Sequence, residues 1–111
     1  MNKYNARKAE YNGIQFDSKK EMERYVDLSS NPNVTNLQRQ VKYELIPKND
    51  LYRAVTYVAD FVYMSGDSKV VEDVKGMVLD VFKLKQKMFY TKYGIPISIW
   101  PPKTPKKRKK K

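Results

Sequence analysis

Two aspartates and a lysine interrupt two segments that otherwise have the composition of buried strands. Asp60 lies in the apolar and aromatic segment 56–63, and Asp73 and Lys75 lie in the valine-rich segment 70–76. An unpaired carboxylate is costly to bury, so acids in such segments indicate a bound cation or a basic partner. Side chains two apart on a strand share a face. The spacing of Asp73 and Lys75 therefore predicts a carboxylate beside an ammonium group.

The composition limits the chemistry that such a site could perform. The 111-residue chain contains no cysteine and no histidine, which excludes disulfides, thiolate nucleophiles, histidine bases and the common zinc ligand sets. Carboxylates, hydroxyls and lysines remain, which are hard oxygen ligands plus a cation. The oxygen ligands suit magnesium, or manganese as its substitute, better than zinc.

The tripeptide acid-x-Lys is a weak signal alone, because this chain contains it three times. The three copies are Asp17-Ser18-Lys19, Asp67-Ser68-Lys69 and Asp73-Val74-Lys75. Only the third lies in an apolar strand segment that has a second acid in the preceding strand. The alternative interpretation is a structural ion-pair cluster between two strands.

Turn residues indicate how these segments are arranged. The cluster 65–68 predicts a hairpin that joins the two acidic strands, and Pro47 with the turn 48–50 connects the strand 37–46 to them. A helix over 78–93 should end at Gly94 and lead to a last strand over 95–100, parallel to another strand. The sequence thus predicts an α/β fold, with a central mixed, largely antiparallel sheet flanked by two helices.

The first of those two helices is predicted near the N-terminus, after a short hairpin over 8–16. Asn12-Gly13 is the dipeptide favoured in a tight hairpin turn. The helix should begin at Ser18, end at Ser29 or Ser30 before Pro32, and bury the stripe Met22, Tyr25, Val26 and Leu28. In the second helix the predicted apolar residues are Val78, Val81, Phe82, Leu84, Met88 and Phe89.

Glu21 has two interpretations. Ser18-Lys19-Lys20-Glu21 fits a capping box, in which the serine and the glutamate satisfy backbone groups at the helix start. Glu21 also lies one turn before Tyr25, at the edge of the apolar stripe, where it could face the acids of the sheet. The sequence leaves both roles open.

The net charge of +11 is unevenly distributed. Seven positive charges lie in 103–111, which leaves +4 for 1–102. We expect a domain over 1–102 and a disordered polybasic tail that binds nucleic acid through phosphate contacts. Candidate phosphate-binding residues elsewhere are Lys83 and Lys87 on the second helix, and Arg7 and Lys8 near the N-terminus. A solvated charged face explains the helical pair equally well.

The combined segments resemble the PD-(D/E)XK nuclease superfamily, which has the restriction-endonuclease-like fold, and more closely a small phage-encoded family within it. The resemblance is carried by four segments: 13–21, 57–61, 71–76 and the lysine-rich 83–87. Ala59 replaces the proline that usually precedes the first aspartate. Glu72 and Asp73 are both candidates for the second acid, and strand alternation favours Asp73.

This resemblance implies a metal-dependent nuclease site. Asp60 and Asp73, with Glu21 and the Val74 carbonyl, would hold one or two magnesium ions at the scissile phosphate. Bound metal would lower the pKa of a water and neutralise developing charge. Lys75 would orient or help deprotonate that water.

The expected protein is therefore a phage-encoded endonuclease that hydrolyses DNA in the host cytoplasm. The sharper expectation is a Holliday-junction resolvase, which implies a homodimer because a symmetric junction needs two active sites. No membrane segment is evident. Two other classes stay open: a non-catalytic nucleic-acid-binding protein, and a phage factor that binds a host protein.

Overall fold

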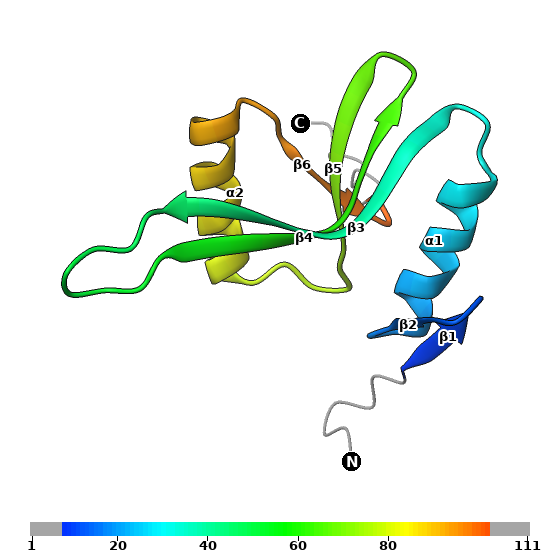
Figure 1. Ribbon diagram of the computed structural model, residues 1–111, viewed down its shortest axis with the longest axis horizontal. Helices are drawn as coiled ribbons and strands as arrows, with labels where there is room; N and C mark the ends of the chain where they lie inside the picture. The colour runs from blue at the N-terminus through cyan, green and yellow to red at the C-terminus, as the bar shows by residue number, and fades with distance from the viewer. Residues whose placement is uncertain (1–7, 103–111) are drawn as a thin grey trace, which may run out of the picture.

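The computed structural model describes residues 8–102, which form six strands and two helices (Figure 1). The strands are β1 (Ala9–Tyr11), β2 (Ile14–Phe16), β3 (Val34–Ile46), β4 (Val55–Ser65), β5 (Ser68–Val74) and β6 (Ile97–Trp100), and the helices are α1 (Lys19–Ser30) and α2 (Asp80–Tyr93). β1 and β2 form a separate two-stranded sheet. The fold is thus α/β, as predicted. The predicted phosphate contact of Arg7 and the predicted polybasic tail over 103–111 lie outside the described residues.

The central sheet has the order β3-β4-β5-β6. β3, β4 and β5 form the predicted antiparallel meander, and β6 returns through α2 to pair in parallel with β5. β3 begins at Val34, earlier than the predicted Leu37. β5 ends at Val74 rather than at Gly76, because its last partner on β6 is Trp100 and two prolines follow. Lys75 therefore lies just beyond the strand.

Local sequence accounts for two of the chain reversals. Asn12 and Gly13 have positive φ angles of 52° and 79°, the conformation that the tight turn between β1 and β2 requires. Gly94 has a φ of 73° at the end of α2, and its N–H donates to the Tyr90 carbonyl at 2.8 Å. Both predictions from the sequence are confirmed.

The two helices cover opposite faces of the sheet. On the α2 face the buried cluster contains Leu45, Tyr57, Ala59, Val62, Val71, Phe82, Phe89 and Ile97. On the α1 face it contains Leu28, Phe61 and Tyr63, with Tyr25 and Val70 packed against it. Neighbours in sequence, such as Val62 and Tyr63, alternate between the faces as a strand requires. Figure 1 shows α1 and α2 at opposite ends of the long β3–β4 pair.

β4 departs from regular alternation at one residue. Ala59 and Phe61 would share a face in a regular strand, yet they belong to the two different clusters. The irregularity falls at Asp60, opposite Gln40 of β3, which has a positive φ of 53°. The sheet is therefore distorted where the predicted site lies.

The predicted buried stripes of the helices are partly wrong. In α1, Leu28 is buried, whereas Met22 and Val26 are only half-buried. In α2, Val81 and Leu84 are 67% and 58% exposed. In α2 the core covers the side chains of Phe82, Met88 and Phe89. Val78 packs against the same core from the loop before the helix, because α2 begins at Asp80 and not at the predicted residue 78.

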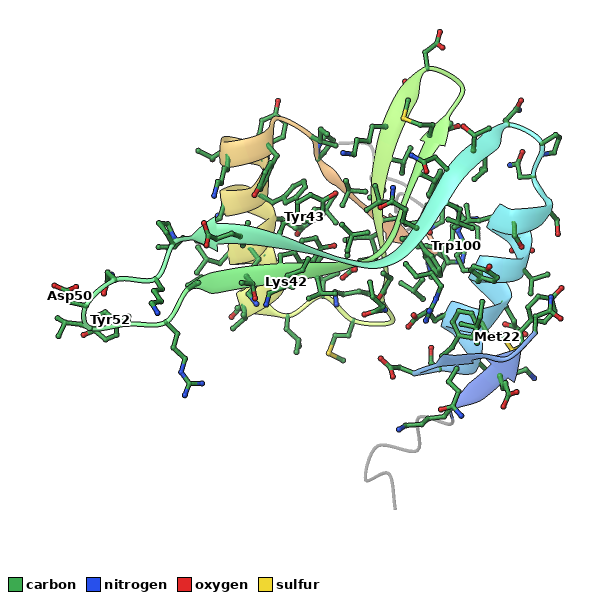
Figure 2. All side chains as sticks on the ribbon, viewed as in Figure 1. Met22, Lys42, Tyr43, Asp50, Tyr52 and Trp100 are labelled. Carbon is green, nitrogen blue, oxygen red and sulfur yellow. The ribbon has the colours of Figure 1, made fainter. Side chains whose placement is uncertain are left out.

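The β3–β4 pair extends beyond the body of the protein as an arm. Figure 2 shows Asp50 and Tyr52 at its tip, while Tyr43 lies near its base, toward α2. Leu51 and Tyr52 at the tip are 81% and 71% exposed. No helix within residues 8–102 is long and apolar enough to cross a membrane.

Candidate active site

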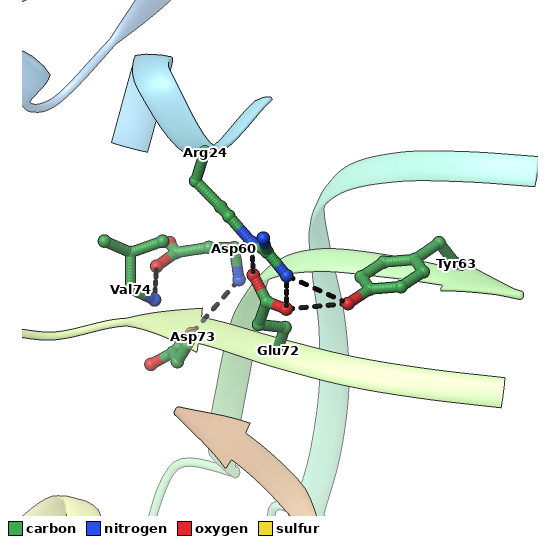
Figure 3. A network of polar contacts seen from close by, with 6 residues as sticks. All are labelled: Arg24, Asp60, Tyr63, Glu72, Asp73 and Val74. Carbon is green, nitrogen blue, oxygen red and sulfur yellow. Dashed lines mark hydrogen bonds and ion pairs between the residues drawn. The ribbon is translucent and has the colours of Figure 1, made fainter. Parts of the chain in front are cut away.

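The predicted aspartates meet where β4 and β5 separate. The last paired residues of the two strands are Phe61 and Glu72. Beyond them, the Asp60 N–H donates to Asp73 Oδ1 at 3.1 Å, and the Val74 N–H donates to Asp60 Oδ2 at 2.9 Å (Figure 3). Each carboxylate thus replaces a strand carbonyl as an acceptor. We call this point, where β4 and β5 separate beyond Phe61 and Glu72, the fork. The two contacts fix both acids at the fork without neutralising them.

Lys75 lies beside the second aspartate, as the spacing predicted. Its Nζ is 3.0 Å from Asp73 Oδ2 and 4.5 Å from the centre of the Phe82 ring. Its backbone N–H donates to the Trp100 carbonyl at 2.9 Å. The chain leaves the sheet at this residue, but the ammonium group stays at the fork.

The two roles of Glu21 separate in the structure. Ser18 Oγ accepts the Glu21 N–H at 3.1 Å and so caps α1. The Glu21 carboxylate points into the site instead, where Gln40 Nε2 donates to its Oε2 at 3.2 Å and Arg39 Nη2 lies 3.9 Å from the same oxygen. The Ser18 side chain therefore caps the helix without help from the Glu21 carboxylate. The buried Glu21 carboxylate lies near the other acids instead.

Gln40 is a site residue that the sequence did not identify. Its amide bridges two acids, donating to Glu21 Oε2 and, at 3.4 Å, to Asp60 Oδ1. Its left-handed backbone is unfavourable for a residue with a side chain, by about 1–2 kcal/mol, and such strain is found most often at functional sites. The available signal was the polar run Gln38-Arg39-Gln40, which breaks the alternation of β3.

Glu72, the alternative acid, belongs to a separate network on the α1 face (Figure 3). Arg24 donates to its two oxygens at 2.7 and 2.8 Å, and the Tyr63 hydroxyl donates to Oε1 at 2.7 Å. The Arg24 guanidinium also lies 3.8 Å from the centre of the Trp100 ring. Such a bidentate pair ties α1 to β5, so Glu72 has a structural role and Asp73 is the acid at the fork.

The acids at the fork repel one another. Burial, then the charges of Asp60 and Asp17, raise the pKa of Glu21 from 4.5 to about 7. Burial, then the charge of Asp73, raise the pKa of Asp60 from 3.8 to about 6, against the opposing effects of the Val74 N–H and Lys75. Burial and repulsion between the acids thus both disfavour the charged carboxylates, and a bound cation would offset both effects.

These raised pKa values predict that the metal-free protein loses stability as pH rises. The folded protein keeps protons on Glu21 and Asp60 that the unfolded chain releases near pH 4–4.5, so the free energy of unfolding falls as pH passes from there through 6 to 7. Between pH 5 and pH 8 the two groups together should cost about 4 kcal/mol of unfolding free energy, at about 1.4 kcal/mol per pKa unit. Urea unfolding in chelator at pH 5 and pH 8 measures it.

Two variants separate this effect from a general charge effect. Glu21→Gln removes one titrating group and should flatten the profile, whereas Glu23→Gln, at an exposed position of the same helix, should leave the parent profile unchanged. A parent stability equal at both pH values would contradict the assignment.

The donor set of the fork suits a divalent cation. Three carboxylates from α1, β4 and β5 supply hard oxygen ligands, and their unneutralised charge favours a cation. Within residues 8–102, however, no three acidic side chains already surround one point closely enough to hold a metal ion. The carboxylates instead face the groups described above, so metal binding would require Gln40 and the Lys75 ammonium to give way.

The remaining predicted phosphate-binding residues lie apart from the acids. Lys83 and Lys87 are on the exposed surface of α2, and Lys8 is exposed just before β1. Lys85, which the sequence did not single out, is half-buried and lines a groove together with Asp73 and Lys75. Its position follows from the burial of Phe82 and Phe89, because residues three or four apart share a helix face.

The fold and the fork define a small α/β protein, with a mixed four-stranded sheet and an acid and lysine site at a strand end. The chain belongs to the family described as "Protein of unknown function (DUF1064)", which it matches over residues 1–109. Comparison with curated proteins and with solved structures gives no match.

Proposed function

We propose that this protein is a magnesium-dependent endonuclease that hydrolyses DNA phosphodiesters. The observation that carries the proposal is the fork, where Asp60, Asp73 and Lys75 converge from two strands with Glu21 and Gln40 beside them. A half-buried Asp60 and a buried Asp73 next to a lysine are poorly explained as a stabilising cluster, because burial, then the charge of Asp73, raise the pKa of Asp60 despite Lys75. A bound cation explains their proximity.

The residues have distinct roles in this proposal. Asp60, Asp73 and Glu21 would hold the cation, and the Val74 carbonyl, at the end of β5, is a further candidate ligand. The bound cation would activate a water and neutralise charge on the phosphate. Once its ammonium has moved off Asp73, Lys75 would orient the attacking water and add positive charge, while the Val74 N–H would keep the Asp60 carboxylate in place.

The wider assignment extends the same proposal. A mixed sheet with a strand-end acid and lysine is consistent with a restriction-endonuclease-like fold. We extend the proposal to a phage-encoded enzyme that acts in the host cytoplasm. Branched DNA, such as a Holliday junction, is the proposed substrate, and a homodimer would supply the two sites that a symmetric junction needs.

Substitution of Lys75 tests the chemical role. We expect Lys75→Met to reduce metal-dependent cleavage about 10²-fold or more, because it removes the group that orients water and stabilises charge. Binding of Mn²⁺, measured by calorimetry, should persist. The control is Lys69→Met, which removes the lysine of the exposed Asp67-Ser68-Lys69 copy and should cleave like the parent.

The result that would contradict this role is equal cleavage by Lys75→Met and the parent. A parent that binds DNA but does not cut it with either metal would favour the non-catalytic alternative. Binding to a host protein that persists at high salt, without DNA cleavage, would favour the host-factor alternative.

A further inference from the structure

A groove of about 430 Å³ opens directly from the acid and lysine pair. Asp73 and Lys75 line one part of it, so a ligand in the groove would adjoin any phosphate held at the fork. The rest of the lining comes from the start of β4, the loop after β5 and the first half of α2. Its volume is typical of small-ligand sites.

The lining of this groove is mainly apolar and accessible. Val58, Met77, Leu79 and Val81 are 42%, 72%, 61% and 67% exposed, although all four are aliphatic or thioether side chains. The walls also include the Phe82 ring. Exposed apolar residues that gather beside a polar site indicate a bound partner with flat or apolar surfaces.

Two further features favour a ligand that carries a phosphate and a polar edge. Lys75 and Lys85 line the groove and supply positive charge next to its apolar wall. Tyr57, only 4% exposed, lines it as well, and its hydroxyl meets no hydrogen-bond geometry among residues 8–102. Burial, then the neighbouring Asp73 carboxylate, raise the pKa of Tyr57. Buried hydroxyls are normally paired, so this group lies between Asp73 and the groove and could donate to the carboxylate or to a ligand.

We propose that the groove receives one unstacked nucleobase of the DNA, next to the phosphate at the fork. The proposal rests on the proposed nuclease function. A base stacked within a duplex cannot enter a side groove, whereas a base at a junction, a mismatch or a single-stranded segment can do so at low cost. The Phe82 ring and the aliphatic side chains around it could contact any base through its face, because every base has an apolar face. The groove thus selects DNA with unpaired bases, with little sequence preference.

The test combines groove variants with removal of the base. The cut position in a four-way junction is mapped first, and then an abasic site replaces the nucleotide on either side of the cut bond. For the parent, loss of the base should lower kcat/KM about tenfold on one side, as expected for one stacking interaction. Met77→Ser combined with Leu79→Ser should cause the same loss on the intact junction and no further loss on the abasic one.

Leu84→Ser is the matched control, because Leu84 is 58% exposed on α2 but does not line the groove. Thermal unfolding checks that all variants fold. Equal losses by the double variant on intact and abasic DNA, or no effect of base removal on the parent, would overturn the inference while leaving the nuclease proposal intact. A parent that cuts none of these substrates would overturn both.

Discussion

Asp73→Asn should abolish metal-dependent cleavage, with a loss of about 10³-fold or more. The substitution keeps an oxygen that can accept the Asp60 N–H, seen at 3.1 Å, but removes the charge that would hold the cation. Loss of several kcal/mol of transition-state stabilisation corresponds to a rate loss of this size. Rates are measured by single-turnover cleavage of labelled DNA in Mg²⁺.

The same variant should lose its stabilisation by metal. A cation that binds only the folded state raises the unfolding temperature, so the parent should be stabilised by millimolar Mn²⁺ and Asp73→Asn should not. Asp67→Asn is the matched control, because Asp67 occupies the same tripeptide pattern in an exposed turn. Unchanged cleavage in Asp73→Asn would remove Asp73 from the site.

Arg24→Met should cause the largest loss of stability, about 3–5 kcal/mol. Arg24 makes both guanidinium contacts to Glu72, which is 3% exposed. Without Arg24, the Tyr63 hydroxyl is the one hydrogen-bond partner left to the buried carboxylate among residues 8–102. Breaking a buried pair from one side is costly to this extent. Urea unfolding at pH 7 measures the change.

Companion variants distinguish loss of the pair from loss of packing. Arg24→Met combined with Glu72→Met should be more stable than Arg24→Met alone, because no unpaired charge is left. Arg53→Met, at an exposed arginine of the β3–β4 arm, should be nearly neutral. Glu72→Gln should retain cleavage within a few-fold, and loss of cleavage equal to that of Asp73→Asn would contradict the separation of the two acids.

Local sequence signals predicted most of the fold. Turn residues such as Asn12-Gly13 and Gly94 act within a few positions, so their effect is readable without the tertiary structure. Which apolar side chains of the helices are buried was harder to predict from the sequence. Val81 and Leu84 are apolar and correctly spaced, but whether they are covered depends on the width of a sheet built from distant segments.

Only part of the candidate site was predictable, because local patterns place some of its residues and long-range contacts place the others. Strand alternation was enough to place Asp73 beside Lys75 and Glu72 on the opposite face. The Gln40 contacts were not predictable, because they depend on a left-handed residue in β3 and on the approach of α1 to the fork. The one sign of these contacts in the sequence is the break in the alternation of β3 at Gln38-Arg39-Gln40.

DNA cleavage by the parent protein is the decisive test of the proposed nuclease activity. Labelled four-way junction, matched duplex and single-stranded DNA are incubated with Mg²⁺ or with chelator, and Asp73→Asn is tested in parallel. We expect cutting that requires Mg²⁺, is strongest on the junction and is absent in Asp73→Asn. Binding of all three DNAs without cutting in Mg²⁺ or Mn²⁺, with equal affinity for both proteins, would contradict it.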